Sequence, residues 1–206
     1  MSSSRRLGGL AVFRHPQLAR FVAGRFCMAI GWQMLAVAVG WQIYSFTHDP
    51  LALGLVGLAE FAPFVVLVLW GGHVADRAER RVVLLSAFAL QCVCIATLLG
   101  LTLAGNRASW PVYLTIAVFG AARAFWMPTA QAIVPSLVPR EEFRHAVAIN
   151  ASFYQAAIIA GPALGGVLFL LGTPIVYGSC LLLFLVNVAL MSSVRPQRVP
   201  RQALAA

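Results

Sequence analysis

Residues 51–81 read LALGLVGLAEFAPFVVLVLWGGHVADRAERR, an apolar run that ends in a cluster of arginines. Within the apolar part of this stretch, over residues 51–75, Glu60 is the single acidic side chain. A helix needs about 20 predominantly apolar residues to cross the hydrocarbon core of a bilayer. The stretch therefore predicts a membrane-spanning helix followed by a short, positively charged connection.

Similar apolar runs lie on both sides of this one. The sequence predicts six spanning helices, over residues 21–46, 51–75, 82–104, 110–136, 146–171 and 174–194. The composition agrees, because 61% of residues are hydrophobic and only 10% are charged, against about 45–50% and about 25% in soluble domains. We expect an all-α membrane protein with a lead-in over 1–20, a six-helix transmembrane domain over 21–194 and a tail over 195–206.

The arginines indicate how the chain is oriented. All 15 basic residues are arginines, and the net charge is +9. If the N-terminus lies inside the cell, twelve arginines fall on inner segments, whereas Arg107 is the single arginine on an outer segment. Cytoplasmic loops of membrane proteins carry such an excess. We therefore expect both termini in the cytoplasm of a bacterium, with the chain in the inner membrane. Short clusters between apolar runs do not form the solvated basic face that a nucleic acid would bind.

The residue types that support catalysis or metal binding are scattered. Four cysteines, Cys27, Cys92, Cys94 and Cys180, lie inside apolar runs, where we expect them to pack against other helices. The spans contain no nucleophile–base pair, no metal-ligand spacing and no phosphate-binding loop. The sequence therefore predicts no enzyme activity, no metal and no cofactor.

The connection after the second span carries a motif. It reads GHVADRAERR over residues 72–81 and resembles the G-x-x-x-D-R-x-G-R-R motif of the major facilitator superfamily, which occupies the same loop in the same orientation. The matching positions are Gly72, Asp76, Arg77, Arg80 and Arg81, and Glu79 stands where the motif has glycine. A carboxylate among guanidinium groups can pair in one conformation and separate in another, so the resemblance implies a gate.

A second resemblance lies in the fifth span. The segment Gly161-Pro162-Ala163-Leu164-Gly165-Gly166 is similar to the G-P-x-x-G-G element typical of exporters in this superfamily. Proline inside a spanning helix frees a backbone carbonyl, and glycine permits close packing. At 100° per residue, Asn150 and Tyr154 share one face with Gly161 and Gly165. We expect that face to contact protein or a cavity.

The resemblance extends over residues 13–200 and points to the branch that contains enterobactin-type and drug-type exporters. It implies one half of a twelve-helix fold, built as a three-plus-three repeat, that works by alternating access. The six spans would then be the N-terminal half, and the residues after 194 would begin the central linker. We expect the chain to be a fragment, to need a separate C-terminal half, or to pair with a second copy of itself. The implied substrate is a small amphipathic molecule.

Three ionisable side chains lie within the spans, and charged residues there are costly and often functional. Glu60 lies about 15 Å from the outer end of its span and Arg123 about 20 Å from the outer end of its own. They either pair to hold two helices together, or face a cavity where Glu60 carries a proton and Arg123 attracts an anionic substrate. Arg25 lies near the cytoplasmic end, and we expect it to extend to the interface.

Two functions remain open on the sequence. The first is proton-coupled export, in which the chain is half of an antiporter. The alternative is a non-transporting remnant or assembly partner that keeps the gate motif without using it. Substitution of Glu60 or Arg123 changes a flux in the first case only.

Overall fold

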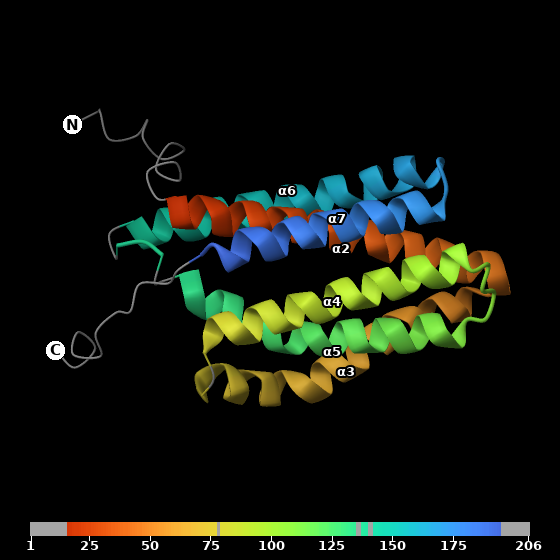
Figure 1. Cartoon of the computed structure of the whole chain (residues 1–206), viewed down its shortest axis with the longest axis horizontal. Helices are drawn as coiled ribbons and strands as arrows, with labels where there is room; N and C mark the ends of the chain where they lie inside the picture. Colours follow the sequence, from red (N-terminus) through yellow and green to blue (C-terminus); the bar gives the residue numbers. More distant parts are fainter. Residues whose placement is uncertain (1–15, 78, 135–136, 140–141, 195–206) are drawn as a thin grey trace.

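The computed structural model describes residues 16–77, 79–134, 137–139 and 142–194, with the backbone alone for 71–77 and 132. The described helices are α2 (Pro16–Thr47), α3 (Pro50–Arg77), α4 (Arg80–Leu103), α5 (Trp110–Ile133), α6 (Phe143–Phe169) and α7 (Thr173–Ser192). Each predicted span coincides with one of these helices, and the ends differ from the prediction by a few residues. The described chain is therefore an all-helical bundle (Figure 1).

Proline and glycine explain where several helices begin and end. A proline lies in the first turn of α2, α3, α5 and α7, where its missing N–H would have no partner within the helix. Gly105 has φ +71° after α4, and Gly172 has φ +115° between α6 and α7. Positive φ costs glycine little because it has no Cβ. These residues make the connections short and turn the chain back across the bundle.

The helices form two groups, which Figure 1 shows as an upper and a lower layer. In the upper layer α2 packs against α6 and α7, and in the lower layer α5 packs against α3 and α4. The layers meet mainly where α4 packs on α7. The α3–α4 and α5–α6 connections lie at the end where the chain enters and leaves the bundle, which we call the terminal end. The other three connections lie at the opposite end.

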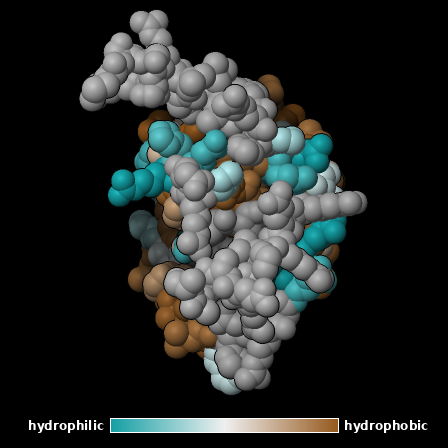
Figure 2. All heavy atoms as spheres, turned by 90° about the vertical axis from the view of Figure 1, so that its left-hand side faces the viewer, coloured by the Kyte–Doolittle hydropathy of each residue, from teal (hydrophilic) through white to brown (hydrophobic). Residues whose placement is uncertain are grey.

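The flanks of the bundle are apolar. Large side chains stand exposed along α3 and α6, among them Leu69 at 82% and Ile159 at 71%. Five helices are long and apolar enough to cross a membrane, namely α2, α3, α4, α6 and α7. The remaining helix, α5, has sufficient length, but Arg123 and several polar residues lower its hydropathy. Figure 2 looks onto the terminal end, where hydrophilic residues gather in front of hydrophobic flanks.

The core combines aromatic packing with a small polar network. The rings of Phe119 and Phe184 lie 5.8 Å apart and join α5 to α7. Near the opposite end, the Gln42 amide donates to the Thr102 hydroxyl at 2.9 Å, and the Tyr177 hydroxyl donates to the Gln42 carbonyl. Polar side chains inside a membrane protein bond across helices in this way. The network therefore ties α2, α4 and α7 together. All four cysteines are free thiols.

A candidate proton and substrate site between α2, α3 and α5

Glu60 and Arg123 meet in the middle of the bundle. Arg123 Nη1 of α5 lies 3.4 Å from Glu60 Oε1 of α3, and about a fifth of each side chain is exposed (22% for Arg123 and 21% for Glu60). The sequence placed the two residues at similar height, and the structure brings their side chains into contact. This geometry fits both alternatives for the pair, since it joins two helices and leaves both groups partly accessible.

Trp32 of α2 completes the cluster. Its indole N–H donates to Glu60 Oε1 at 3.0 Å, so the carboxylate oxygen that lies nearest Arg123 also accepts from α2. The Arg123 guanidinium carbon lies 4.1 Å from the centre of the Trp32 ring and 4.9 Å from that of Phe64. A guanidinium group is attracted to the face of an aromatic ring at such distances. The two rings and the carboxylate together hold the Arg123 side chain in place.

Gly120 sets the distance between α3 and α5. A Cβ atom at Gly120 would lie 2.0 Å from the Glu60 backbone oxygen and 2.8 Å from its carbonyl carbon. Any other side chain would therefore push the helices apart. Gly120 precedes Arg123 by three residues, so both lie on the same face of α5. Nearer the opposite end, the Tyr113 hydroxyl donates to the Ala52 carbonyl at 3.2 Å and adds a second α3–α5 contact.

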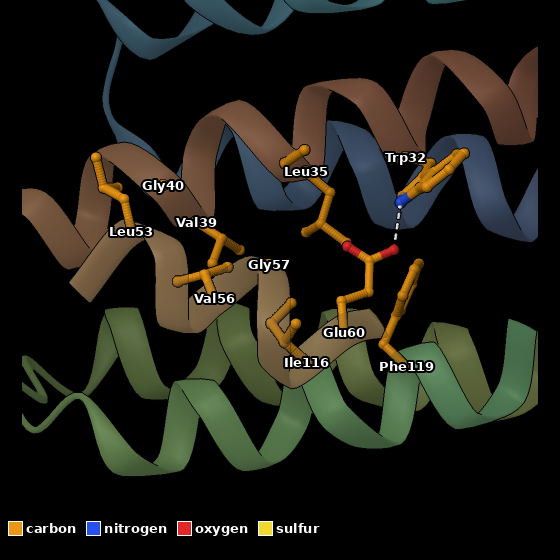
Figure 3. Close-up of a pocket in the computed structure, with 11 residues that line it drawn as sticks. Trp32, Leu35, Val39, Gly40, Leu53, Val56, Gly57, Glu60, Ile116 and Phe119 are labelled. Atoms are coloured by element: carbon orange, nitrogen blue, oxygen red, sulfur yellow. Dashed lines mark hydrogen bonds between the residues drawn. The ribbon is translucent and has the colours of Figure 1, made fainter. Parts of the chain in front are cut away.

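A cavity of about 230 Å³ opens beside the cluster. It lies between α2, α3 and α5. Glu60 and Trp32 lie at the end of the cavity nearer the middle of the bundle, and Gly40 and Leu53 lie toward the opposite end of the bundle (Figure 3). Its walls are mostly apolar, and Glu60 supplies the charged group. The Glu60 carboxylate points toward Trp32 in this view. An apolar cavity with one polar anchor is the usual form of a small-molecule site.

The glycine–proline element of α6 packs against α2. A Cβ at Gly161 would lie 2.5 Å from Gln33 Cβ, and one at Gly165 would lie 3.0 Å from Met34 Cα. Pro162 cannot bond to the carbonyl of Ile158, and the Gln33 side chain donates to that carbonyl at 3.4 Å. Gly166 has nothing within 4 Å of its Cβ position and faces outward.

Asn150 and Tyr154 lie on the part of α6 that faces α2, nearer the terminal end. The guanidinium carbon of Arg25 lies 5.2 Å from the centre of the Tyr154 ring. Asn150 Oδ1 is buried and has no partner among the described residues. The predicted polar face of α6 therefore contacts α2, and Arg25 stacks on Tyr154 there. The sequence counted the depth of Arg25 but did not indicate this neighbour.

The gate motif is described in part. The side chains of Gly72, Asp76 and Arg77 lie outside the described residues, and Arg80 is exposed at the start of α4. Arg81 donates to the backbone carbonyl of Ser192 in the last turn of α7. Glu79 has φ −65°, which any residue can adopt, so replacing the usual glycine there creates no strain. Arg81 thus connects the motif to the end of α7.

Sequence reasoning missed Trp32 and Gly120 as parts of the site. Trp32 was one of five tryptophans, and its role depends on how α2 is rotated against α3. Gly120 could have been found from the sequence, because it is a glycine on the same helix face as Arg123. Asn187 was also missed: its side chain is 0% exposed, and both of its polar atoms lack partners among the described residues.

Comparison with known proteins identifies related chains. A family model described as transmembrane secretion effector matches residues 7–206. An enterobactin exporter of Citrobacter koseri is 34% identical over 163 residues, which cover 77% of this chain and 38% of the relative. An enterobactin exporter of Salmonella choleraesuis is 32% identical with the same coverage. A staphyloferrin A transporter of Staphylococcus aureus is 24% identical over 149 residues, which cover 72% of this chain and 38% of the relative. The matched part is thus less than half of each relative.

Proposed function

The chain belongs to the transmembrane secretion effector family of the major facilitator superfamily, and we propose that it forms the N-terminal six-helix half of a proton-coupled exporter. As a member of this family it is a multi-pass membrane transporter and not an enzyme. The proposed substrate is a small amphipathic molecule, because the relatives are named for the export of enterobactin and the transport of staphyloferrin A.

The cluster of Glu60, Arg123 and Trp32 beside the cavity is the observation that carries this proposal. Ionised Glu60 accepts hydrogen bonds from α2 and α5, which draws α3 against both helices. A proton on Glu60 removes the charge that Arg123 pairs with and weakens this junction. Donor groups of a substrate in the cavity would compete with the proton for the same carboxylate. Such competition is the basis of antiport, and an intramembrane carboxylate is a common proton carrier.

Alternating access requires helices that rock without losing their contacts. The close approach of α6 to α2 at Gly161 and Gly165, and the Gln33 bond beside Pro162, support a flexible but continuous junction there. The bond from Arg81 to the end of α7 supports a gate at the terminal end. In the proposed gate, Asp76 and Arg77 would act beside Arg80 and Arg81.

The packing pattern supports a three-plus-three repeat. Exchanging α2 with α5, α3 with α6 and α4 with α7 converts the α2–α6 pair into the α3–α5 pair. The same exchange converts the α2–α7 pair into the α4–α5 pair and leaves the α4–α7 pair unchanged. All of these pairs are in contact. The most extensive contacts of the two groups of three consecutive helices therefore correspond, as a repeat requires.

The proposed orientation puts the terminal end in the cytoplasm of a bacterial cell. The helix ends there carry Arg20, Arg80, Arg81 and Arg144, whereas Arg107 lies at the opposite end. This distribution follows the positive-inside rule and supports an inner-membrane location.

We propose that a second six-helix unit, either a C-terminal half or another copy of this chain, covers α3 and α6. The chain matches only 38% of the length of its relatives. Ser152 and Gln155 are exposed on α6, and polar side chains in lipid normally find a protein partner. The cavity of about 230 Å³ is also smaller than the roughly 300–1,000 Å³ of typical ligand pockets. A second unit would enlarge the site and shield these residues.

Efflux from cells tests the proposal. Cells that lack their own exporters would be loaded with enterobactin or ethidium and would express the chain alone or with a C-terminal six-helix half. We expect efflux that Glu60→Gln abolishes and that Asp49→Asn, an equivalent change at the exposed start of α3 where asparagine can still cap the helix, leaves intact. Efflux by the chain alone would identify the second copy as the partner. Expression without any Glu60-dependent efflux in either arrangement would support a non-transporting remnant.

A further inference from the structure

Arg25 is an intramembrane cation that the proposed proton exchange does not use. It lies on α2 seven residues before Trp32, which places both on nearly the same face of the helix. Its guanidinium carbon lies 5.2 Å from the centre of the Tyr154 ring and 5.9 Å from that of Phe21. The side chain is therefore held between α2 and α6, on the side of the bundle that also carries the Glu60 cluster.

This guanidinium group has no carboxylate partner in the part of the chain that the structure describes. The ion pair found there joins Arg123 to Glu60, and Arg25 makes ring contacts only. Arg25 Nε is buried without a hydrogen-bond partner, and so is Asn150 Oδ1, one turn before Tyr154 on α6. Arginines inside a membrane normally pair with an acid or a carbonyl, or extend to the interface. An unpaired arginine among polar groups indicates a ligand that supplies the missing charge.

The surroundings indicate the chemistry of that ligand. A guanidinium fork binds a carboxylate through two parallel hydrogen bonds. Aromatic side chains flank the guanidinium group, because the Tyr154 and Phe21 rings lie 5.2 and 5.9 Å from it. Ring faces and edges bind other flat rings. An aromatic molecule with an acidic group matches both features.

We propose that Arg25, Asn150 and Tyr154 form an anion-binding subsite for the acidic group of an aromatic substrate. This proposal rests on the export function proposed above, because it makes the ligand the transported molecule. The subsite lies nearer the terminal end than Glu60, so a substrate from the cytoplasm reaches it first. A phospholipid phosphate carries the same charge, and Arg25 also lies over Phe21, one turn nearer the terminal end of α2, so the experiment below includes an anionic lipid.

Equilibrium binding tests the subsite without any need for transport. The full chain in phosphatidylcholine nanodiscs would be titrated with radiolabelled benzoate and with its neutral analogue benzamide. We expect benzoate to bind and benzamide to bind far more weakly. Arg25→Gln should weaken benzoate binding by about tenfold or more, the loss expected when a charged donor is removed. Arg25→Lys should retain part of the affinity, and Arg20→Gln should retain nearly all of it because Arg20 is exposed five residues earlier on α2.

Three outcomes would overturn the proposal. Equal benzoate binding by the original chain and Arg25→Gln would show that the arginine is not the anion site. Equal binding of benzamide would show that charge is not recognised. Displacement of benzoate by phosphatidylglycerol in the nanodisc would assign Arg25 to lipid headgroups. Size-exclusion profiles of each variant separate lost binding from lost folding. Because no flux is measured, the subsite can fail while export stands, and export can fail while the subsite stands.

Discussion

Glu60 of α3 and Arg123 of α5 lie 3.4 Å apart, and Trp32 of α2 donates to the same carboxylate oxygen at 3.0 Å. Three helices therefore meet at one oxygen atom. The contact depends on the close approach of α3 and α5 at Gly120, one turn before Arg123. Changes to the α3–α5 distance, to the hydrogen-bond donors or to the Glu60 carboxylate therefore test separate parts of this cluster.

Gly120→Ala should separate α3 from α5. The added methyl group would lie 2.0 Å from the Glu60 backbone oxygen, so the helices must move apart. Overpacking of this kind costs about 1–3 kcal/mol of unfolding free energy. Thermal unfolding of the purified chain in detergent would measure the loss. The control is Gly100→Ala on α4, where nothing lies within 4 Å of the Cβ position. Equal unfolding temperatures for the two variants would contradict the close contact.

Trp32→Phe should keep the ring over Arg123 and remove the N–H donor to Glu60. Because one hydrogen bond disappears, we expect the interaction at the cluster to weaken by about 1 kcal/mol. The transport rate should fall about fivefold as a result. Trp32→Leu removes the ring as well and should cost more. The measurement is the initial efflux rate at matched expression. A Phe variant as active as the original chain would show that the indole N–H is dispensable.

The bond from Gln33 to the Ile158 carbonyl exists because Pro162 leaves that carbonyl free. Gln33→Leu should therefore cost about 0.5–1.5 kcal/mol in the original chain. In a Pro162→Ala background the helix supplies its own N–H to Ile158, so the same change should cost less. A double-mutant cycle on unfolding free energies measures the difference. Additive costs would mean that Gln33 and Pro162 act independently.

Gly161 and Gly166 belong to one motif but face different surroundings. Gly161→Ala would bring a methyl group within 2.5 Å of Gln33 Cβ, whereas Gly166→Ala meets nothing within 4 Å. We expect the first change to destabilise the six-helix unit by about 1–3 kcal/mol and the second to leave it unchanged. Unfolding of the isolated chain measures both. A stability loss in the Gly166 variant alone would place the α2 contact on the other side of α6.

Helix number and approximate boundaries follow from the sequence, because spanning length and turn residues are local properties. Proline at positions 16, 50, 111 and 174 and glycine at 105 and 172 mark most of the turns. The heights of Glu60 and Arg123 could be counted along their helices, so their meeting was one of two predicted outcomes. Counting residues along a helix gives the depth of a side chain in the membrane, but not the neighbouring helix that the side chain faces.

The partners of Trp32 and Arg25 and the full burial of Asn187 could not be predicted for that reason. Each depends on which face a helix turns toward its neighbours, and apolar residues on every side of these spans hide that face. Gly120 shares a helix face with Arg123, but its contact with the Glu60 backbone depends on the position of another helix. Packing between helices, which no single segment encodes, decided these parts of the site.

In the proposed antiport, Glu60 carries the exchanged proton. The direct measurement uses proteoliposomes that contain the chain with its second six-helix unit and a pH-sensitive dye inside. Addition of enterobactin should release protons from the lumen with the original chain and with Asp49→Asn, and should release none with Glu60→Gln. Proton release at full amplitude with Glu60→Gln would contradict this role of Glu60. The contact between Glu60 and Arg123 would then be structural.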